Sequence, residues 1–212
     1  MEYIRCLQAV EQNDIALVGG KAANLGMLAR ADLPVPPGFV ILTSAYQEFL
    51  IANGMQITIE EFAERINPLE PDSIEQASQS IRLLIEQGTM PDELTDAIFA
   101  AYAQIGDGSV AVRSSATAED LPGASFAGQQ ESYLNINGSE QVLTAVKRCW
   151  SSLWTARAIA YRAQRGIKAG GVSMAVIVQQ MIPADVAGYR WRTVIHTASA
   201  TSYNPCSWHY ER

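Results

Sequence analysis

The sequence predicts a chain of mixed helices and strands, in the α+β class. Short apolar runs rich in β-branched residues, such as 110–112 and 172–182, are typical of buried strands. Longer stretches with apolar residues three and four positions apart, such as 72–87 and 138–165, are typical of amphipathic helices. Apolar residues make up 48% of the 212 residues and charged residues only 17%, so the chain can bury a sizeable core.

Residues 15–31 combine an apolar run, a Gly-Gly turn and a helical pattern. Lys21 falls in the first turn of the expected helix. The start of a helix favours anions, because its N–H groups are unpaired and its dipole is positive there. A lysine at this place is slightly unfavourable unless an anion is nearby. Lys21 is therefore either a solvated surface charge or one arm of an anion site.

Between residues 39 and 106 the sequence predicts one strand followed by helices. The run 39–42 follows a proline-rich entry and suits a buried strand. Serine or aspartate followed three residues later by glutamine or glutamate predicts a capping box at two helix starts, and Pro91 suits the first turn of another helix. We expect 60–106 to be a helical insertion without a role in chemistry. The capping pairs are Ser44 with Gln47 and Asp72 with Glu75.

The stretch 110–135 carries the strongest signal of a binding site. A short strand ends at Arg113, a loop of small and turn-forming residues follows, and 131–135 suits a returning strand. A guanidinium is always charged and can bind phosphate oxygens through two parallel hydrogen bonds. Glycine and serine let backbone N–H groups approach an anion closely. The stretch therefore predicts either a polyphosphate site or a polar hairpin with a long surface loop.

After this loop the sequence predicts one long helix, 138–165, capped by Asn137 with Glu140. Trp150 and Trp154 are four residues apart, share a face, and are expected in the core. The basic residues of this helix are expected on its solvated side. They are Arg148, Arg157, Arg162 and Arg165.

The last expected strand is the near-continuous apolar run 172–182. Its end, 178–181, carries two glutamines and a methionine. The edge of a buried strand of this kind can offer backbone groups to a planar base, with apolar side chains above and below it.

Composition excludes several classes of protein. The net charge of -7 argues against a general nucleic-acid binder. No run of 18 apolar residues could span a membrane, and the N-terminus lacks the apolar core of a signal peptide. Cys6, Cys149 and Cys206 lack metal-ligand spacing and are expected to be free thiols. We therefore expect a cytoplasmic protein that binds neither nucleic acid nor a membrane.

Four segments of the sequence are long and specific: GGKAANLGML, PVPPGFVIL, VAVRSSATAEDLPGASFAGQQESYLN and VSMAVIVQQMIPADVAG. They resemble the N-terminal nucleotide-binding region of phosphoenolpyruvate synthase, which pyruvate phosphate dikinase and rifampicin phosphotransferase share. The resemblance covers residues 1 to about 188. It implies an ATP-grasp architecture, in which ATP lies between two α+β subdomains.

The resemblance also implies roles for individual residues. Lys21 and Arg113 match the lysine and the arginine that bind ATP phosphates. The loop 117–128 matches the loop that covers those phosphates, and Gln179 matches a polar contact on the adenine side. The matching ATP-binding positions are Lys21, Arg113, Thr117, Gly123, Ser125, Gly128, Ser132, Gln179 and Met181.

In the family, the complete enzyme converts ATP, pyruvate and water to phosphoenolpyruvate, AMP and phosphate. The phosphoryl group passes through a histidine on a separate domain to pyruvate held in a barrel. No counterpart of these two domains is expected here, and the Mg²⁺ ligands are expected in a second half beyond residue 188. The resemblance implies that this chain holds ATP without catalytic residues or metal ligands and is inactive alone. The alternatives are the ATP-binding domain of a rifampicin phosphotransferase and a non-catalytic nucleotide-binding remnant.

Residues 189–212 depart from the family pattern. They hold both histidines of the chain and show no sustained helical or strand period. We expect a disordered tail, and our hypothesis is an out-of-frame translation. His196, Cys206 and His209 lack the close ligand pair of a metal site, so no metal is expected there. Because partner strands would lie in a lost second half, we expect strand 172–182 to have an open apolar edge.

Overall fold

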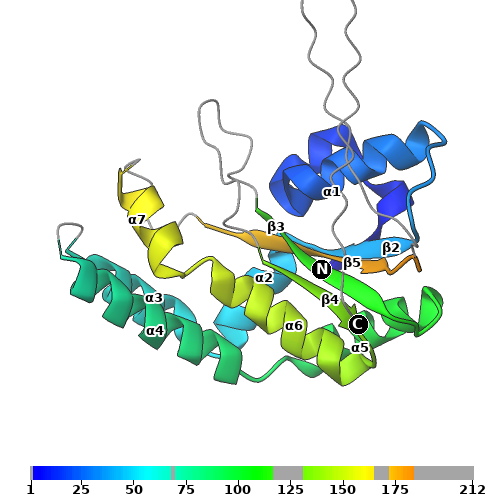
Figure 1. Cartoon of the computed structure of the whole chain (residues 1–212). Coiled ribbons are helices and arrows are strands. Elements are labelled where there is room, and N and C mark those ends of the chain that lie inside the picture. The colour runs from blue at the N-terminus through cyan, green and yellow to red at the C-terminus, as the bar shows by residue number, and fades with distance from the viewer. Residues whose placement is uncertain (1, 68–69, 117–130, 165–171, 184–212) are drawn as a thin grey trace, which may run out of the picture. The chain divides into compact units, whose positions relative to one another are not determined.

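The computed structural model describes residues 2–67, 70–116, 131–164 and 172–183. Met1–Met181 form one compact unit, and of the second unit, Ile182–Arg212, only residues 182 and 183 lie within the described ranges. The α+β class is confirmed, because the described residues form an antiparallel five-stranded sheet with helices on both faces (Figure 1). The strand order is β1-β2-β5-β3-β4. The strands are β1 (Ile4–Cys6), β2 (Gly38–Ile41), β3 (Val110–Ala116), β4 (Ser132–Ile136) and β5 (Met174–Gln180).

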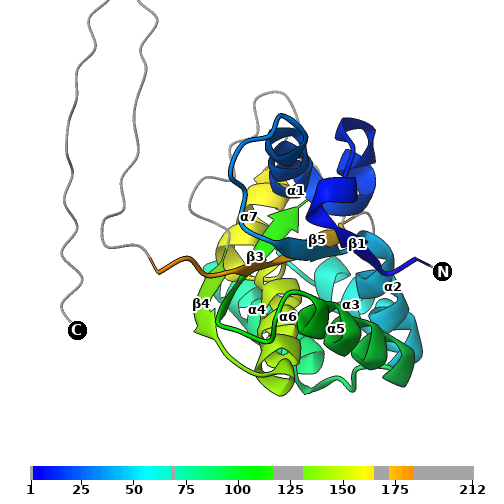
Figure 2. The same cartoon turned by 90° about the vertical axis from the view of Figure 1, so that its right-hand side faces the viewer.

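The helices are divided unequally between the two faces of the sheet. Helix α1 lies on one face, and helices α2 to α6 lie on the other, as Figure 1 and the turned view in Figure 2 show. Two short 3₁₀ helices, η1 (Leu7–Ala9) and η2 (Gln12–Asp14), lead into α1. The α-helices are α1 (Ile15–Arg30), α2 (Thr43–Ala52), α3 (Met55–Glu64), α4 (Pro71–Gln87), α5 (Asp92–Gln104), α6 (Ser139–Ser152) and α7 (Ala156–Gln164).

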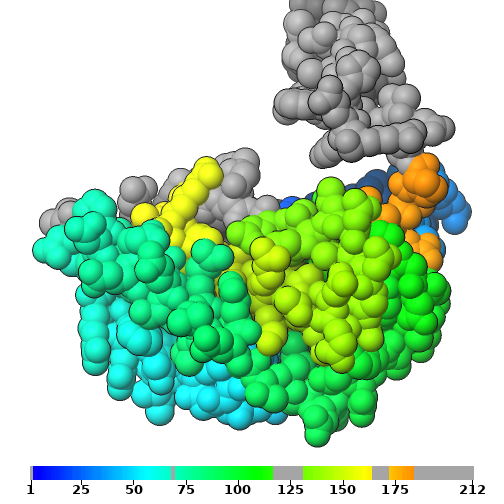
Figure 3. All heavy atoms as spheres, turned by 60° about the horizontal axis from the view of Figure 1, so that its bottom comes forward, coloured from blue at the N-terminus to red at the C-terminus, as the bar shows by residue number. Residues whose placement is uncertain are grey.

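The larger core lies between the sheet and the helical layer that Figure 3 shows from outside. Trp150 is fully buried there, with ring centroids 5.1 Å from Phe49 and 5.7 Å from Tyr46. The Trp154 Nε1 atom donates a hydrogen bond of 3.0 Å to the Tyr46 hydroxyl. The expectation that both tryptophans belong to the core is therefore confirmed.

The smaller core lies between the sheet and α1. Val18 and Ala22 of α1 pack there with Val40 of β2 and Ile177 of β5. Side chains alternate between the two faces along a strand, and residues directly opposite each other on paired strands share a face. Arg113 of β3 is opposite Ile177, so Arg113 belongs to the α1 face of the sheet.

Two expectations about the strands are wrong. Arg113 does not end its strand, because β3 pairs with β5 continuously as far as Ala116. Arg113 lies at the middle of β3. The strand at 172–182 has no open edge, because β5 pairs with β2 on one side and β3 on the other. The strands at the two edges are β1 and β4, and β4 matches the predicted returning strand.

The predicted capping boxes are also wrong. Helix α2 begins one residue before Ser44, whose hydroxyl donates to the backbone oxygen of Glu2 at 2.8 Å. Helix α4 begins at Pro71, so Asp72 lies inside its first turn. The N-cap of α6 is Gly138, with a φ of 87° and no side-chain cap. Helix α4 ends at Gln87, where the helical pattern 72–87 also ends.

The helix predicted over 138–165 is two helices, α6 and α7. Thr155 starts the second one, since its Oγ1 accepts a hydrogen bond from the Ala158 N–H at 3.2 Å. Because of this break, the side of α7 that faces the core differs from the side expected for one continuous helix. Arg162 is consequently buried instead of solvated, and its guanidinium donates to the Leu153 oxygen at 2.5 Å. Burial lowers the pKa of Arg162 to about 10.

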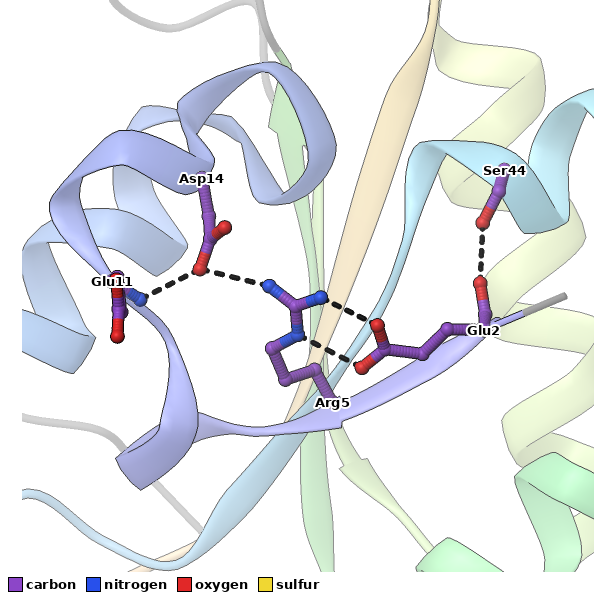
Figure 4. A network of polar contacts seen from close by, with 5 residues as sticks. All are labelled: Glu2, Arg5, Glu11, Asp14 and Ser44. Atoms are coloured by element: carbon purple, nitrogen blue, oxygen red, sulfur yellow. Dashed lines mark hydrogen bonds and ion pairs between the residues drawn. The ribbon is translucent and has the colours of Figure 1, made fainter.

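An ion-pair network ties the start of α1 to β1 (Figure 4). The Arg5 guanidinium binds both carboxylate oxygens of Glu2, at 2.5 and 2.9 Å, and the Asp14 carboxylate at 2.8 Å. Asp14 also accepts the Glu11 N–H at 2.8 Å. The Glu11 N–H and Arg5 lower the pKa of Asp14, the first more than the second.

This network predicts a loss of stability in acid. A carboxyl whose pKa is lowered by folding stabilises the fold above its unfolded pKa of about 3.9, and this contribution disappears as pH falls through the folded value. Asp14→Asn should lower the melting temperature at pH 7 by about 2–4 °C. Below the folded pKa of Asp14 the variant and wild type should melt together. Glu61→Gln, in an exposed pair 3.8 Å from Arg65, is the control and should change little. A deficit of Asp14→Asn that persists at the lowest pH would contradict the prediction.

Candidate functional site

Helix α1 is interrupted at the Gly-Gly pair. Gly19 has a φ of 71° and a ψ of 163°, which is not helical, and the helix resumes directly after it. Glycine is required here because this backbone region is closed to residues with a Cβ atom. Lys21 therefore lies in the first turn of the resumed helix, as the sequence predicted.

The resumed helix starts against the end of β3. The Ala22 N–H donates to the Ser115 Oγ atom at 3.3 Å, and the Lys21 Nζ atom donates to the Ser114 backbone oxygen at 3.3 Å. A Cβ atom on Gly19 would lie 2.3 Å from the Ser115 backbone oxygen. Residues 93 positions apart are thus held in direct contact.

Arg113 and Lys21 converge on the same face of the sheet. Arg113 is half-buried on the α1 face, one residue before the carbonyl that Lys21 contacts. Among the described residues, none forms a hydrogen bond or ion pair with the Arg113 guanidinium. Ser132 is directly opposite Arg113 on β4 and is exposed. The two cations and this hydroxyl thus come from neighbouring positions on α1, β3 and β4.

Gln179 lies on the same face, further along β5, opposite Ala111. It is buried, and its Nε2 atom donates to the Pro36 oxygen at 3.1 Å. Ser115 is opposite Ala175, so four residue steps, or about 13 Å, separate the helix start from Gln179 along β5.

Met181 lies directly after β5 and forms a backbone hydrogen bond there. Its N–H donates to the Ser109 oxygen at 2.9 Å, and the neighbouring Gln180 N–H donates to the Pro37 oxygen at 2.9 Å. These bonds fix the end of β5 between the segments before β2 and β3. The remaining predicted positions lie outside the described residues. They are Thr117, Gly123, Ser125 and Gly128.

Two further features of the described residues bear on the chemistry of the site. Burial raises the pKa of Cys149 well above its ordinary range, so this thiol stays protonated and is a poor nucleophile. Within 2–67, 70–116, 131–164 and 172–183, no group of three or more His, Cys, Asp or Glu side chains could hold a metal ion. No helix in this part of the chain is long and apolar enough to cross a membrane.

Two residues of this site were not predicted from the sequence. Gly19 and Ser115 join α1 to β3, yet neither was assigned a role. The available signals were the Gly-Gly pair interrupting a helical pattern and the second hydroxyl after Arg113. Neither signal indicates by itself that the two segments meet.

The α+β domain matches a family of nucleotide-binding domains. The family described as "Pyruvate phosphate dikinase, AMP/ATP-binding domain" matches residues 15–201. The chain belongs to this family.

Relatives with assigned names agree with the family. A "Probable phosphoenolpyruvate synthase" of Methanocaldococcus jannaschii is 44% identical over 194 residues, covering 89% of this chain and 16% of that protein. Another, of Archaeoglobus fulgidus, is 46% identical and covers 86% of this chain and 25% of that protein. A "Rifampicin phosphotransferase" of Streptomyces sviceus is 42% identical, and the match covers 95% of this chain and 23% of that protein. The chain thus spans about a quarter or less of the length of these relatives.

Proposed function

We propose that this chain is the ATP-binding part of a phosphoenolpyruvate synthase-like phosphotransferase. The observation that carries the proposal is the convergence of Lys21 and Arg113 on one face of the sheet from distant segments. ATP phosphates would lie against these cations and the start of the resumed helix, where N–H groups favour anions. The base would lie toward Gln179, about 13 Å away along β5.

The family supports finer features of this proposal. We place the chain in the ATP-grasp class, with ATP lying between this sheet and a second subdomain. Mg²⁺ would neutralise the phosphates during transfer, and its ligands would come from outside the described residues. The loop residues Thr117, Gly123, Ser125 and Gly128 would cover the phosphates. The free thiols of Cys6 and Cys149 suit a reducing cytoplasm.

The phosphoryl acceptor is proposed from the relatives that carry the phosphoenolpyruvate synthase name. A histidine on a separate domain would take the phosphoryl group and pass it to pyruvate in a barrel domain. The rifampicin phosphotransferase relative supports a second acceptor with the same nucleotide region. In both cases this chain supplies ATP binding and is expected to be inactive alone.

Replacing Lys21 tests the proposed function. Lys21→Gln should raise the Kd for ATP about tenfold to a hundredfold, because a charged hydrogen bond to phosphate is worth about 1.5–3 kcal/mol. Titration calorimetry of the 212-residue chain with ATP measures this. Adenosine, which has no phosphate, should bind wild type and variant alike.

Lys147 offers a matched control. It is also half-buried, and its Nζ atom also donates to a backbone oxygen, that of Gly88 at 3.0 Å, but it lies on the opposite face of the sheet. Lys147→Gln should leave the Kd for ATP unchanged. Equal effects of the two substitutions, or none from Lys21→Gln, would contradict the proposed function.

A further inference from the structure

We infer that Ser115 is a positioning residue for the phosphate half of the site. This inference rests on the proposed function. Ser115 would not touch ATP, but would set the place of Lys21 and of the helix start that carries it. The contacts between α1 and β3 carry the inference.

The first contact is a cap supplied from another segment. The Ser115 hydroxyl is fully buried and accepts the Ala22 N–H at 3.3 Å. A helix start leaves its first N–H groups without partners, and a serine oxygen is a favoured acceptor for one of them. Because the cap comes from β3 and not from the preceding residue, it fixes the resumed helix relative to the strand.

The second contact is steric. The Gly19 backbone passes so close to Ser115 that an added Cβ atom would lie 2.3 Å from the Ser115 oxygen and 2.5 Å from its Oγ. The chain therefore cannot move toward β3, while the hydrogen bond to Ala22 prevents it from moving away. Lys21 lies between these two points in sequence, and its Nζ atom reaches the Ser114 oxygen.

The consequence is a fixed distance between two phosphate-binding cations. Arg113 is two residues before Ser115 on the same strand and the same face. Lys21 is one residue before Ala22 on the helix. The Ser115–Ala22 bond thus joins directly the two segments that carry the two cations. Loss of this bond should weaken ATP binding through Lys21, without removing any group that touches ATP.

Two substitutions separate the hydrogen bond from packing. Ser115→Ala removes the acceptor, and Ser115→Cys keeps a side chain of similar size with only a weak acceptor. Each should raise the Kd of the 212-residue chain for ATP about fivefold, the effect of one neutral hydrogen bond, and leave the Kd for adenosine unchanged. Amide exchange at Ala22, followed by NMR, should become faster in both. Ser152→Ala is the control, because Ser152 is 2% exposed and bonds the Cys149 oxygen on the other face.

A double-mutant cycle distinguishes positioning from general destabilisation. In the Lys21→Gln background, Ser115→Ala should have a clearly smaller effect on the Kd for ATP, because most of its effect acts through Lys21. Ser115→Ala could instead raise the Kd for ATP equally in the wild-type and Lys21→Gln backgrounds, or Ser115→Cys could keep wild-type affinity. Either result would overturn the inference about Ser115 but not the proposed function. Failure of wild type to bind ATP, or a Kd insensitive to Lys21→Gln, would overturn the proposed function and this inference with it.

Discussion

Gly19→Ala should destabilise the protein more than any other single substitution of the site. The backbone at φ 71° and ψ 163° belongs to a region that costs a residue with a Cβ atom about 1–3 kcal/mol. The new Cβ would also lie 2.3 Å from the Ser115 oxygen, and relieving such overpacking costs about 1–3 kcal/mol. The free energy of unfolding should therefore fall by roughly 3 kcal/mol, a large part of the roughly 5–15 kcal/mol of a typical domain. Urea denaturation measures the loss.

Gly54 provides the control for this prediction. It also has a positive φ, 63°, but nothing lies within 4 Å of the place that its Cβ would occupy. Gly54→Ala should cost only about 1–2 kcal/mol, the penalty of the left-handed conformation. If Gly19→Ala and Gly54→Ala lower the free energy of unfolding by the same amount, the prediction is contradicted. The close contact between Gly19 and Ser115 would then not be the reason for a glycine in α1.

Arg113→Ala should weaken ATP binding about tenfold to a hundredfold, with little loss of stability. A charged hydrogen bond to phosphate is worth about 1.5–3 kcal/mol, and about 1.4 kcal/mol corresponds to a tenfold change in Kd. The fold should tolerate the change, because none of the described residues pairs with this guanidinium. Arg113→Lys should recover only part of the affinity, since an ammonium lacks the planar fork. Calorimetric titration with ATP and thermal melting measure the two effects separately.

Arg82→Ala is the control for Arg113. Arg82 lies on α4, on the opposite face of the sheet, 3.7 Å from Glu86. Its removal should not change the Kd for ATP. If Arg113→Ala keeps wild-type affinity but melts at a lower temperature, Arg113 has a structural role and does not bind phosphate.

The sequence was sufficient for the features that depend on local pattern. The apolar run 172–182 became β5, and the alternating run after the loop became β4. Trp150 and Trp154 were placed in the core because helical spacing puts them on one face. The Gly-Gly pair indicated a break before Lys21, and the structure has that break at Gly19.

Features that depend on long-range contacts could not be predicted in this way. The length of β3 and the position of Arg113 within it follow from pairing with β5, which lies about sixty residues later in the chain. The Ser44 hydroxyl donates a hydrogen bond to the backbone oxygen of Glu2, which precedes β1, instead of capping its own helix. Arg162 is buried because Thr155 starts a new helix and turns this residue toward Trp154, 5.0 Å from its ring.

The central claim is that ATP binds on the α1 face of the sheet, between the start of the resumed helix and Gln179. Backbone amide NMR of the chain during titration with ATP and Mg²⁺ tests it most directly. The largest shifts should fall on Gly20, Lys21 and the segment from Arg113 to Ser115, with smaller shifts near Gln179. Amides of α3 and α4, on the opposite face, should not move. The claim would be contradicted if Gly20, Lys21 and the segment from Arg113 to Ser115 showed no shifts, or if the largest shifts fell on α3 and α4.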